Sequence, residues 1–366
     1  MEIIKVASLF SGCGGTDLGF EGGFNFLGKH YRRLNTEIVY ANDIEKSACE
    51  IFNKNFNIKC INDDIRNIKG SNVPDHDILT GGFPCQSFSI VAQNPPRLGY
   101  KDEKGKLFFE MVRILKKKQP KVFIAENVKG ILSANNRKAF PLIIQNFEDA
   151  GYFVNWKLLN SVNFGVPQKR ERVFIVGIRK DLNYNFHFPM GNYLDSHVPL
   201  KRVLFPDNEI PEKYFFSERA VQGLLNSNKA MNKGRAQDPE RPCNTVGAHL
   251  AKVSLNSTDP VLITNGKYRR FLPREVARIQ SFPDSFQLVG TDSAQYKALG
   301  NAIPPVLMWN IADAIIKQVF DRTLIYQDFK DQYNFVFEKD TSARPVLRLK
   351  RGAGVEDKQV SALPST

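Results

Sequence analysis

Cys85 is the residue in this sequence whose type and position favour covalent chemistry most clearly. It lies in the run G-G-F-P-C-Q-S at residues 81–87, directly after a short apolar segment that ends at Thr80. A cysteine on a proline-containing loop at the carboxyl end of a strand is well placed to act as an exposed nucleophile. The alternative is that Cys85 is a small buried hydrophobic residue, which is the usual environment of a free cysteine.

An acid and two arginines lie next to other apolar segments. Glu126 begins the run E-N-V immediately after residues 122–125, so its carboxylate is expected at the same sheet edge as Cys85. Arg170 and Arg172 lie in the run Q-K-R-E-R, just before another apolar segment. Residues two apart in a strand point to the same side, so we expect these two guanidinium groups to point the same way. A surface run of ion pairs is the alternative for this second cluster.

A glycine-rich segment, F-S-G-C-G-G at residues 10–15, follows the first apolar segment and precedes a helical stretch. Glycines let backbone N–H groups approach a ligand, and a helix N-terminus favours anionic groups. Asp43, at the end of the next expected strand, suits the two ribose hydroxyls of a nucleotide-like cofactor. The two motifs are separated by more than the roughly 20 residues of the dinucleotide-binding template, which an insertion around residues 29–36 explains. A glycine turn without a ligand is the alternative.

The elements that must position these residues alternate along the first 180 residues. Apolar, β-rich segments alternate with helix-like segments, which is typical of a doubly wound α/β sheet. Ligands bind such sheets at the carboxyl ends of the strands. The expected strands are residues 3–10, 38–41, 78–80, 122–125, 153–159 and 173–178, and the expected helices are residues 44–56, 107–118 and 138–150.

The chain changes character after about residue 180. Prolines, asparagines and short apolar segments dominate residues 181–270, which predicts a smaller, irregular, β-leaning domain. Helical patterning returns at residues 273–280 and 304–319. The run G-N-A-I-P-P at residues 300–305 is expected to open the second of these helices, and its alternative is only a turn and a helix start. We therefore expect a first domain over residues 1–180, the irregular domain over 181–270, helices returning to the first domain over 271–322, and a loosely ordered tail over 341–366.

The composition excludes several classes of protein. The 366 residues are 42% hydrophobic and 24% charged, as in ordinary globular proteins and unlike disordered or collagen-like chains. The 51 Lys and Arg residues outnumber the 38 Asp and Glu residues, and the surplus, concentrated between residues 101 and 180, favours an anionic partner. The five widely spaced cysteines form no C-x-x-C motif, so we expect an intracellular protein without a disulfide framework or a bound metal. No segment reaches the roughly 20 apolar residues of a membrane span.

Taken in chain order, these motifs resemble those of the DNA (cytosine-5)-methyltransferase family. The matching runs are F-S-G-C-G-G at residue 10, N-D at 42, P-C-Q at 84, E-N-V at 126, Q-K-R-E-R at 168 and G-N-A at 300. The match covers about residues 1–180 and 268–320, and Thr245-Val246 matches a short element of the family's variable target-recognition region. The resemblance implies a Rossmann-like, mostly parallel sheet of the S-adenosylmethionine-dependent methyltransferase type, with residues 181–270 as the target-recognition domain.

The resemblance also implies that the glycine-rich segment binds S-adenosyl-L-methionine. Phe10 would stack on the adenine, Asp43 would bind the ribose hydroxyls, and Asp64 would bind the adenine amino group. Many family members have Glu at the position of Asp43 and an aromatic residue at that of Ile44, so this chain has a shorter acid and lacks a stacking surface. The other expected cofactor contacts are Gly12, Gly14, Gly15, Ile44, Ile65, Asn301 and Ala302.

Carbon 5 of cytosine is a poor nucleophile, and the resemblance assigns Cys85 as the thiolate that adds to carbon 6 and makes carbon 5 electron-rich. A free thiol has a pKa of about 8.5, so nearby positive charge or a helix terminus must increase its thiolate fraction. Glu126 would neutralise the ring at N3, while Arg172 would bind the O2 oxygen and hold Glu126. Arg170 is the fourth expected catalytic residue. The target base must leave the duplex stack, and we expect the loop over residues 86–106 to close over it.

The expected partner is double-stranded DNA, bound mainly through electrostatic contacts. We expect a monomeric bacterial protein of the cytoplasm and nucleoid, belonging to a restriction–modification system with a cognate endonuclease that acts on the same site. Asn244 and His249 are candidates for reading bases in the major groove. The expected substrate contacts are Gln86, Ser87, Asn127, Gln168, Arg235, Arg241 and Thr245.

Other functions explain fewer of the motifs. A nicotinamide-dependent dehydrogenase shares the glycine-rich segment and the acid, but it does not explain P-C-Q together with Glu126 and Arg172. The intact Cys85 disfavours a catalytically silent DNA-binding protein. A methyltransferase acting on amino groups would carry a D/N-P-P-aromatic element, which is absent here, and the length of the middle region disfavours the relative that acts on transfer RNA.

Overall fold

The computed structural model describes residues 2–84, 107–226, 235–251 and 259–321, together with two strands at residues 334–339 and 345–350. Residues 1–321 form one compact unit and residues 322–366 form a second. In the second unit, strands β14 (Asn334–Lys339) and β15 (Pro345–Lys350) pair antiparallel. Strand β15 lies in the tail that the sequence predicts to be loosely ordered, and the other residues of that tail lie outside the described part of the chain.

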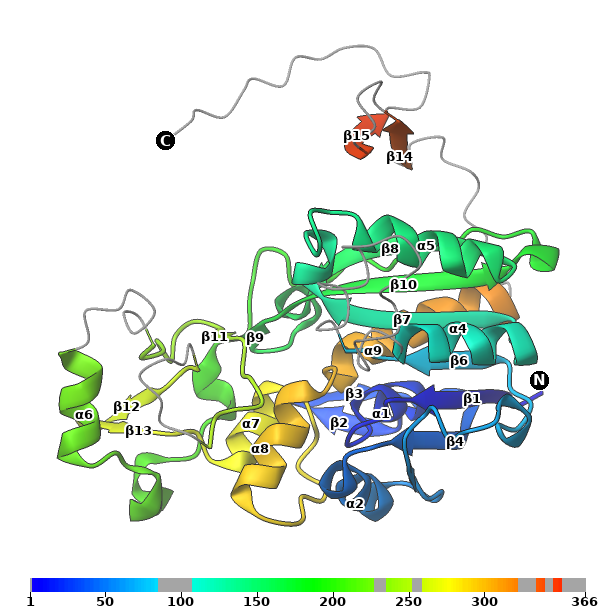
Figure 1. The fold of residues 1–366 in the computed structure, drawn as a ribbon. Coiled ribbons are helices and arrows are strands. Elements are labelled where there is room, and N and C mark those ends of the chain that lie inside the picture. Colours follow the sequence, from blue (N-terminus) through cyan, green and yellow to red (C-terminus); the bar gives the residue numbers. More distant parts are fainter. Residues whose placement is uncertain are drawn as a thin grey trace. The chain divides into compact units, whose positions relative to one another are not determined.

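A seven-stranded sheet forms the centre of the first unit (Figure 1), with the strand order β5-β4-β1-β6-β7-β10-β8. All neighbouring strands are parallel except β10, which runs antiparallel to both β7 and β8. The predicted Rossmann-like, mostly parallel α/β sheet is therefore confirmed. The strands are β1 (Ile4–Leu9), β4 (Thr36–Asp43), β5 (Ile61–Asn62), β6 (Ile78–Gly81), β7 (Val122–Val128), β8 (Tyr152–Asn160) and β10 (Glu171–Arg179).

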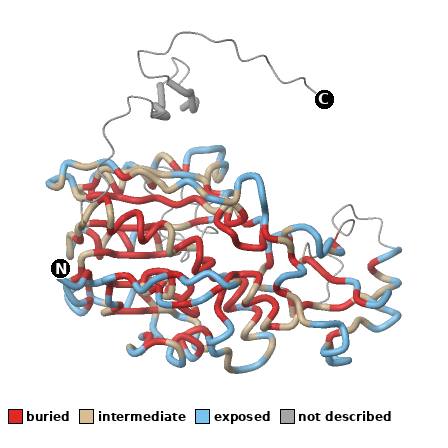
Figure 2. Tube along the Cα trace, turned by 180° about the vertical axis from the view of Figure 1, so that it is seen from behind, coloured by how far each residue is buried: buried red, intermediate tan, exposed pale blue. Residues whose placement is uncertain are grey.

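Helices cover both faces of this sheet, and Figure 2 shows most of the strand residues as buried. Phe123 and Ile124, neighbours in β7, show how the two faces alternate. Phe123 belongs to the hydrophobic cluster formed with α4 and α5, and Ile124 to the cluster formed with α1 and α9. Strands buried on both faces are almost continuously apolar, which is why the sequence reveals them. The helices are α1 (Gly15–Glu21), α4 (Leu107–Lys118), α5 (Ala139–Asp149) and α9 (Pro305–Ile315).

The chain between the glycine-rich segment and Asp43 forms a hairpin that begins before the insertion expected around residues 29–36 and overlaps it only in part. Strands β2 (Phe24–Phe26) and β3 (Lys29–Tyr31) pair antiparallel and stand between α1 and β4. Helix α2 (Lys46–Asn55) begins three residues after β4 ends, so Asp43 lies at the turn from a strand into a helix.

The region between β10 and helix α7 (Pro273–Ile279) is built from short elements. Its two-residue strand β11 pairs in parallel with β9, which consists of Gln168 and Lys169. A fully buried ion pair at 2.8 Å joins Arg269, at the end of β13, to Glu275 on α7. The predicted irregular character is observed here, but the described elements are short helices as well as short strands, and the proposed domain boundaries stay a prediction. The described elements include α6 (Glu218–Leu225), β11 (Cys243–Asn244), β12 (Leu262–Thr264) and β13 (Lys267–Arg269).

The C-terminal helices of the first unit differ in detail from the sequence prediction. Gly300 and Asn301 end helix α8 (Asp292–Asn301), which the apolar pattern does not predict, and α9 begins at Pro305. Helix α9 continues into a π-helical turn, Ile316–Phe320. The stretch from Asp292 to Phe320 is long and apolar enough to cross a membrane, but 83% of its most apolar window is buried inside the protein. These helices are therefore part of the core.

Candidate active site

A cavity of about 360 Å³ lies at the carboxyl ends of β1, β4, β6 and β7, bounded on its other side by the α8–α9 junction. Pro84 lines it, while the next residue, Cys85, lies outside the described residues, as do Gln86, Ser87 and the loop over residues 86–106. The predicted site residues that line the cavity are Phe10, Gly12, Gly15, Asp43, Glu126, Asn127, Arg170, Arg172, Asn301 and Ala302.

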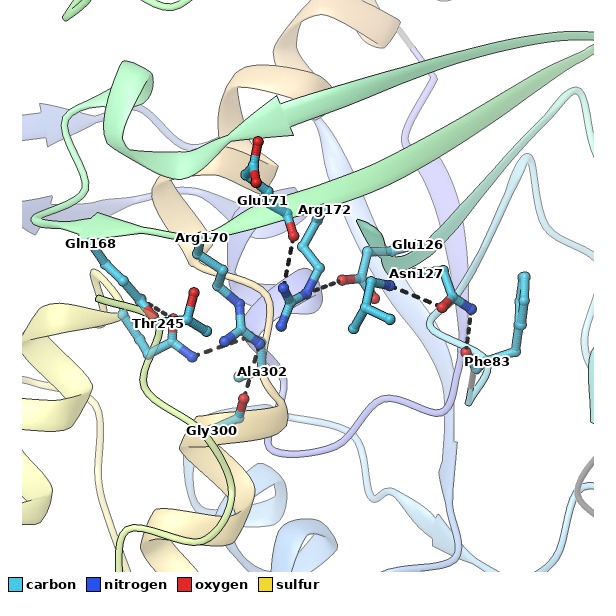
Figure 3. Close-up of polar contacts among 12 residues, drawn as sticks. Phe83, Glu126, Asn127, Gln168, Arg170, Glu171, Arg172, Thr245, Gly300 and Ala302 are labelled. Atoms are coloured by element: carbon cyan, nitrogen blue, oxygen red, sulfur yellow. Dashed lines mark hydrogen bonds and ion pairs between the residues drawn. The ribbon is translucent and has the colours of Figure 1, made fainter. Parts of the chain in front are cut away.

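Glu126 and Arg172 form an ion pair at the cavity wall (Figure 3), with 3.0 Å between Glu126 Oε1 and Arg172 Nε. They lie on the adjacent strands β7 and β10, and their side chains are only 14% and 13% exposed. Burial raises the pKa of Glu126, and the positive charges of Arg172 and Arg170 oppose that shift. A carboxyl group held in this way keeps its proton to a higher pH than an exposed one, so it can serve as a proton donor.

Asp43 forms an acidic site on the opposite side of the cavity. Its carboxylate accepts hydrogen bonds from the backbone N–H groups of Gly12 and Glu45, each at 2.8 Å. Burial raises the pKa of Asp43, and these two N–H donors oppose the shift. A carboxylate has about four acceptor positions, so Asp43 can still accept hydrogen bonds from a pair of hydroxyl groups.

The glycine-rich segment is packed closely against the rest of the cavity wall. Phe10 has a φ of +55°, a left-handed conformation that is rare for a bulky residue and that clusters at functional sites. A Cβ atom on Gly15 would lie 2.3 Å from the carbonyl oxygen of Ile303. Only glycine therefore allows α1 to approach the chain just before α9.

Comparisons with known proteins agree with this arrangement. The profile of the C-5 cytosine-specific DNA methylase family matches residues 4–317. The chain belongs to this family. Type II methyltransferase M.FnuDI of Fusobacterium nucleatum is 39% identical to this methylase over 357 residues, covering 91% of this chain and all of the relative. Type II methyltransferase M.HhaI of Haemophilus parahaemolyticus is 33% identical over 313 residues, covering 82% and 90% of the two chains.

A solved structure, the Dnmt2 methyltransferase of S. pombe, shares the fold. It superposes with a TM-score of 0.68 over 87% of this methylase and all of that chain, at 20% sequence identity. The predicted family and activity are confirmed by the family match, and the protein is an enzyme that methylates carbon 5 of cytosine in DNA.

Four of the predicted cofactor residues of this methylase, Gly14, Ile44, Asp64 and Ile65, do not line the cavity. Ile44 is 67% exposed, and Ile65 is buried in the cluster beneath α4. The carboxylate of Asp64 pairs with Arg66 at 2.6 Å, and that pairing lowers the pKa of Asp64. Their contact with a cofactor stays a prediction.

Asn127 supports the chain that leads to the predicted nucleophile. Its side-chain amide donates to the carbonyl oxygen of Phe83 at 2.8 Å, and its Oδ1 accepts from the backbone N–H of Val128 at 2.9 Å (Figure 3). Asn127 therefore ties the end of β7 to the residues just before Cys85. A contact of Asn127 with substrate, as predicted, is not tested by this geometry.

Arg170 and Gln168 are almost completely buried behind the Glu126–Arg172 pair. Figure 3 shows Arg172 between Arg170 and Glu126, so the two arginines of the Q-K-R-E-R run gather at one place. The guanidinium group of Arg170 donates to the carbonyl oxygens of Val246 and Gly300, at 3.1 and 2.9 Å. Burial lowers the pKa of Arg170 to about 9.

The predicted base-reading residues are spread over the short elements of the middle region. Arg235 is buried, and its Nε donates to the carbonyl oxygen of Asp259 at 2.8 Å. Arg241 is 78% exposed and lies 3.4 Å from Asp238. The hydroxyl of Thr245 donates to the carbonyl oxygen of Lys169 at 2.7 Å, which joins this region to β9, just before β10. Asn244 and His249 are exposed.

The sequence prediction missed two charged residues of the cavity wall. Glu45, just before α2, and Lys297, on α8, both line the cavity and form an ion pair with each other. Lys297 lies three residues before the G-N-A run, which is the one hint in the sequence. Among the described residues, no group of three or more His, Cys, Asp or Glu side chains is placed to hold a metal ion.

Proposed function

We propose that this methylase modifies cytosine within one specific sequence of double-stranded DNA, as the modification enzyme of a restriction–modification system. The observation that carries the proposal is the buried Glu126–Arg172 pair, which shares one cavity with the glycine-rich segment and Asp43. The two relatives described above are Type II methyltransferases, which supports a sequence-specific modification role.

The cavity wall suits S-adenosyl-L-methionine as the methyl donor. Asp43 offers a carboxylate already fixed by two N–H donors, which fits a ribose diol. Gly15 packs too closely against Ile303 to carry a side chain, so the backbone forms the cavity wall at this point. When bound, this cofactor supplies an electrophilic methyl group on its sulfonium centre. Phe10, Asp43, Asn301 and Ala302 would hold it.

Activation of the cytosine would fall to Cys85, Glu126 and Arg172. The Cys85 thiolate forms a bond to carbon 6. The electron pair of the carbon 5–carbon 6 double bond shifts to carbon 5 and is delocalised toward N3. Glu126 delivers its proton to N3, while Arg172 donates to the O2 oxygen and holds the Glu126 carboxylate. Once carbon 5 is methylated, a base removes the carbon 5 proton, the carbon 5–carbon 6 double bond re-forms, Cys85 leaves as a thiolate and the N3 proton returns to Glu126.

A stacked base exposes no face to a thiolate, so the target cytosine must swing out of the duplex, at a cost of a few kcal/mol. Phosphate contacts through the basic surplus would supply most of the affinity, which should fall steeply with salt. Residues 181–270 would read the site from the major groove. We further propose that the enzyme acts as a monomer in the bacterial cytoplasm, on the nucleoid, alongside an endonuclease that cuts the same site.

Expression in a host without DNA methylation, followed by bisulfite sequencing of the genome, tests this function. The expected result is 5-methylcytosine at one position of one recurring short sequence. The matched control is Glu126→Gln, which should strongly reduce methylation at the same sites. Absence of 5-methylcytosine with folded protein, or methylation without a recurring sequence, would contradict the proposal.

A further inference from the structure

A chain of two buried glutamine amides links the middle region to the cofactor side of the cavity. The backbone N–H of Val246 donates to Gln168 Oε1 at 2.8 Å, and Gln168 Nε2 donates to Gln280 Oε1 at 2.7 Å. Gln280 Nε2 then donates to the carbonyl oxygens of Leu299, at 2.5 Å, and Ala302, at 3.3 Å. Each amide is oriented by the next one, so neither can turn over without losing its partners.

A second bridge runs beside the first. Arg170 binds the carbonyl oxygen of Val246 and the carbonyl oxygen of Gly300 (Figure 3). Both polar groups of the Val246 backbone are therefore held by side chains: Arg170 reaches the α8–α9 junction directly, and Gln168 is linked to it through Gln280. The backbones themselves meet there, since a Cβ on Gly300 would lie 2.2 Å from the carbonyl oxygen of Gly247.

All members of this bridge are shielded from water. Gln168, Gln280, Val246 and Leu299 are fully buried. Breaking a buried hydrogen bond leaves an unpaired polar group, whose penalty is larger than the net gain of an ordinary surface bond. The bridge therefore favours one arrangement of Val246 relative to residues 299–302.

The two ends of the bridge lie in parts of the chain that we expect to bind different ligands. Gly300, Asn301 and Ala302 line the cavity expected to hold the methyl donor. Val246 follows Thr245, which lies in the region expected to face DNA. We propose that Gln280 is a positioning residue that couples the two sites, so that the bound cofactor strengthens DNA binding and bound DNA strengthens cofactor binding by the same factor. This inference rests on the proposed function.

The test measures that factor directly. The dissociation constant of S-adenosyl-L-homocysteine, which carries no methyl group to transfer, is measured with and without a duplex containing the sequence identified by bisulfite sequencing. The wild-type factor is expected to be roughly tenfold, within the usual range for coupled sites. In Gln280→Met, which removes the amide, the factor should fall below about twofold, while each ligand alone still binds.

Two further variants distinguish a loss of coupling from a general loss of structure. Gln280→Glu keeps the acceptor for Gln168 but has no N–H for Leu299 and Ala302, so it should lose the coupling as well. Gln237→Met is the matched control, because Gln237 binds the backbone N–H of Asn244, only two residues from Val246, at 2.8 Å without reaching the α8–α9 junction. It should keep the wild-type factor.

Hydrogen exchange of the wild-type enzyme gives a measurement that does not depend on any variant folding. Cofactor binding without DNA should slow exchange of the Val246 amide. The inference is overturned by unchanged Val246 exchange, by a wild-type factor of one, by a folded Gln280 variant with the wild-type factor, or by an equal loss in Gln237→Met. Failure of the wild-type enzyme to bind either ligand would instead contradict the proposed function.

Discussion

The carboxyl edge of the sheet and the middle region of this methylase are built in opposite ways. At the sheet edge, Glu126 and Arg172 lie on strands of seven and nine residues, and their side chains are only 14% and 13% exposed. In the middle region β11 has two residues, β12 and β13 have three, and Arg241 is 78% exposed. Reaction chemistry needs a few groups at fixed distances, whereas reading a DNA sequence needs exposed groups on a surface that can differ between relatives.

Replacement of Glu126 should have the largest effect at the sheet edge. Glu126→Gln removes the ionisable group, and kcat should fall on the order of 10²- to 10⁴-fold while DNA and cofactor binding persist. Burial raises the pKa of Glu126, so if the reaction needs its proton, kcat should decrease as pH rises through that pKa. The variant should lack this decrease in a pH–rate profile.

Glu171→Gln is the matched control, since Glu171 is next to Arg172 but pairs with the exposed Lys129 instead. Its kcat should stay near that of the wild type. A similar loss of activity in both variants would show that the buried pair has no special role.

Replacement of Asp43 should separate cofactor binding from DNA binding. Asp43→Ala removes a charged acceptor, so the dissociation constant of the cofactor should increase about 10- to 100-fold, measured by calorimetry. DNA affinity without cofactor should not change. Glu37→Gln, at an exposed position of the same strand, is the control, and equal effects of the two substitutions would contradict the role of Asp43.

Close packing at the sheet edge predicts an effect on stability. Gly15→Ala would place a methyl group 2.3 Å from the carbonyl oxygen of Ile303, which should lower the free energy of unfolding by about 1–3 kcal/mol. Gly130→Ala is the control, because the atom nearest to its added methyl group is 3.9 Å away. Thermal unfolding should show a lower Tm for the first variant, and equal Tm values would argue against close packing there.

The smallest effect on stability is expected in the middle region. Arg241→Ala breaks an exposed ion pair, so the free energy of unfolding should change by no more than about 0.5 kcal/mol. If Arg241 contacts a phosphate, the slope of log affinity against log salt should become shallower by about one. An unchanged slope would remove Arg241 from the DNA-binding surface, and a large loss of stability would contradict the contrast between the two regions.

The sequence predicted most of the sheet edge because the physical signals there are local. Strands buried on both faces are apolar throughout, and the polar residues that follow them must meet at one edge. For this reason the structure brings Glu126, Arg172, Asp43 and part of the glycine-rich segment to one cavity.

Other features depend on contacts between residues far apart in the chain, and the sequence did not reveal them. The Glu45–Lys297 pair joins residues more than 250 positions apart, and the amide chain through Gln280 joins four separate segments. Helix α8 lacks the spacing of apolar residues that marks an amphipathic helix. Arg235, predicted to touch DNA, is a buried residue that donates to the backbone, which composition alone could not show.

The most direct test of the account uses a DNA duplex in which the target cytosine carries fluorine at carbon 5. Fluorine cannot leave carbon 5 as a proton does, so the cysteine adduct cannot be released after methylation. The wild-type enzyme with S-adenosyl-L-methionine should give a covalent complex whose mass equals protein plus DNA plus one methyl group, and Cys85→Ser should give none. An enzyme that methylates ordinary DNA yet forms no such complex would contradict the mechanism.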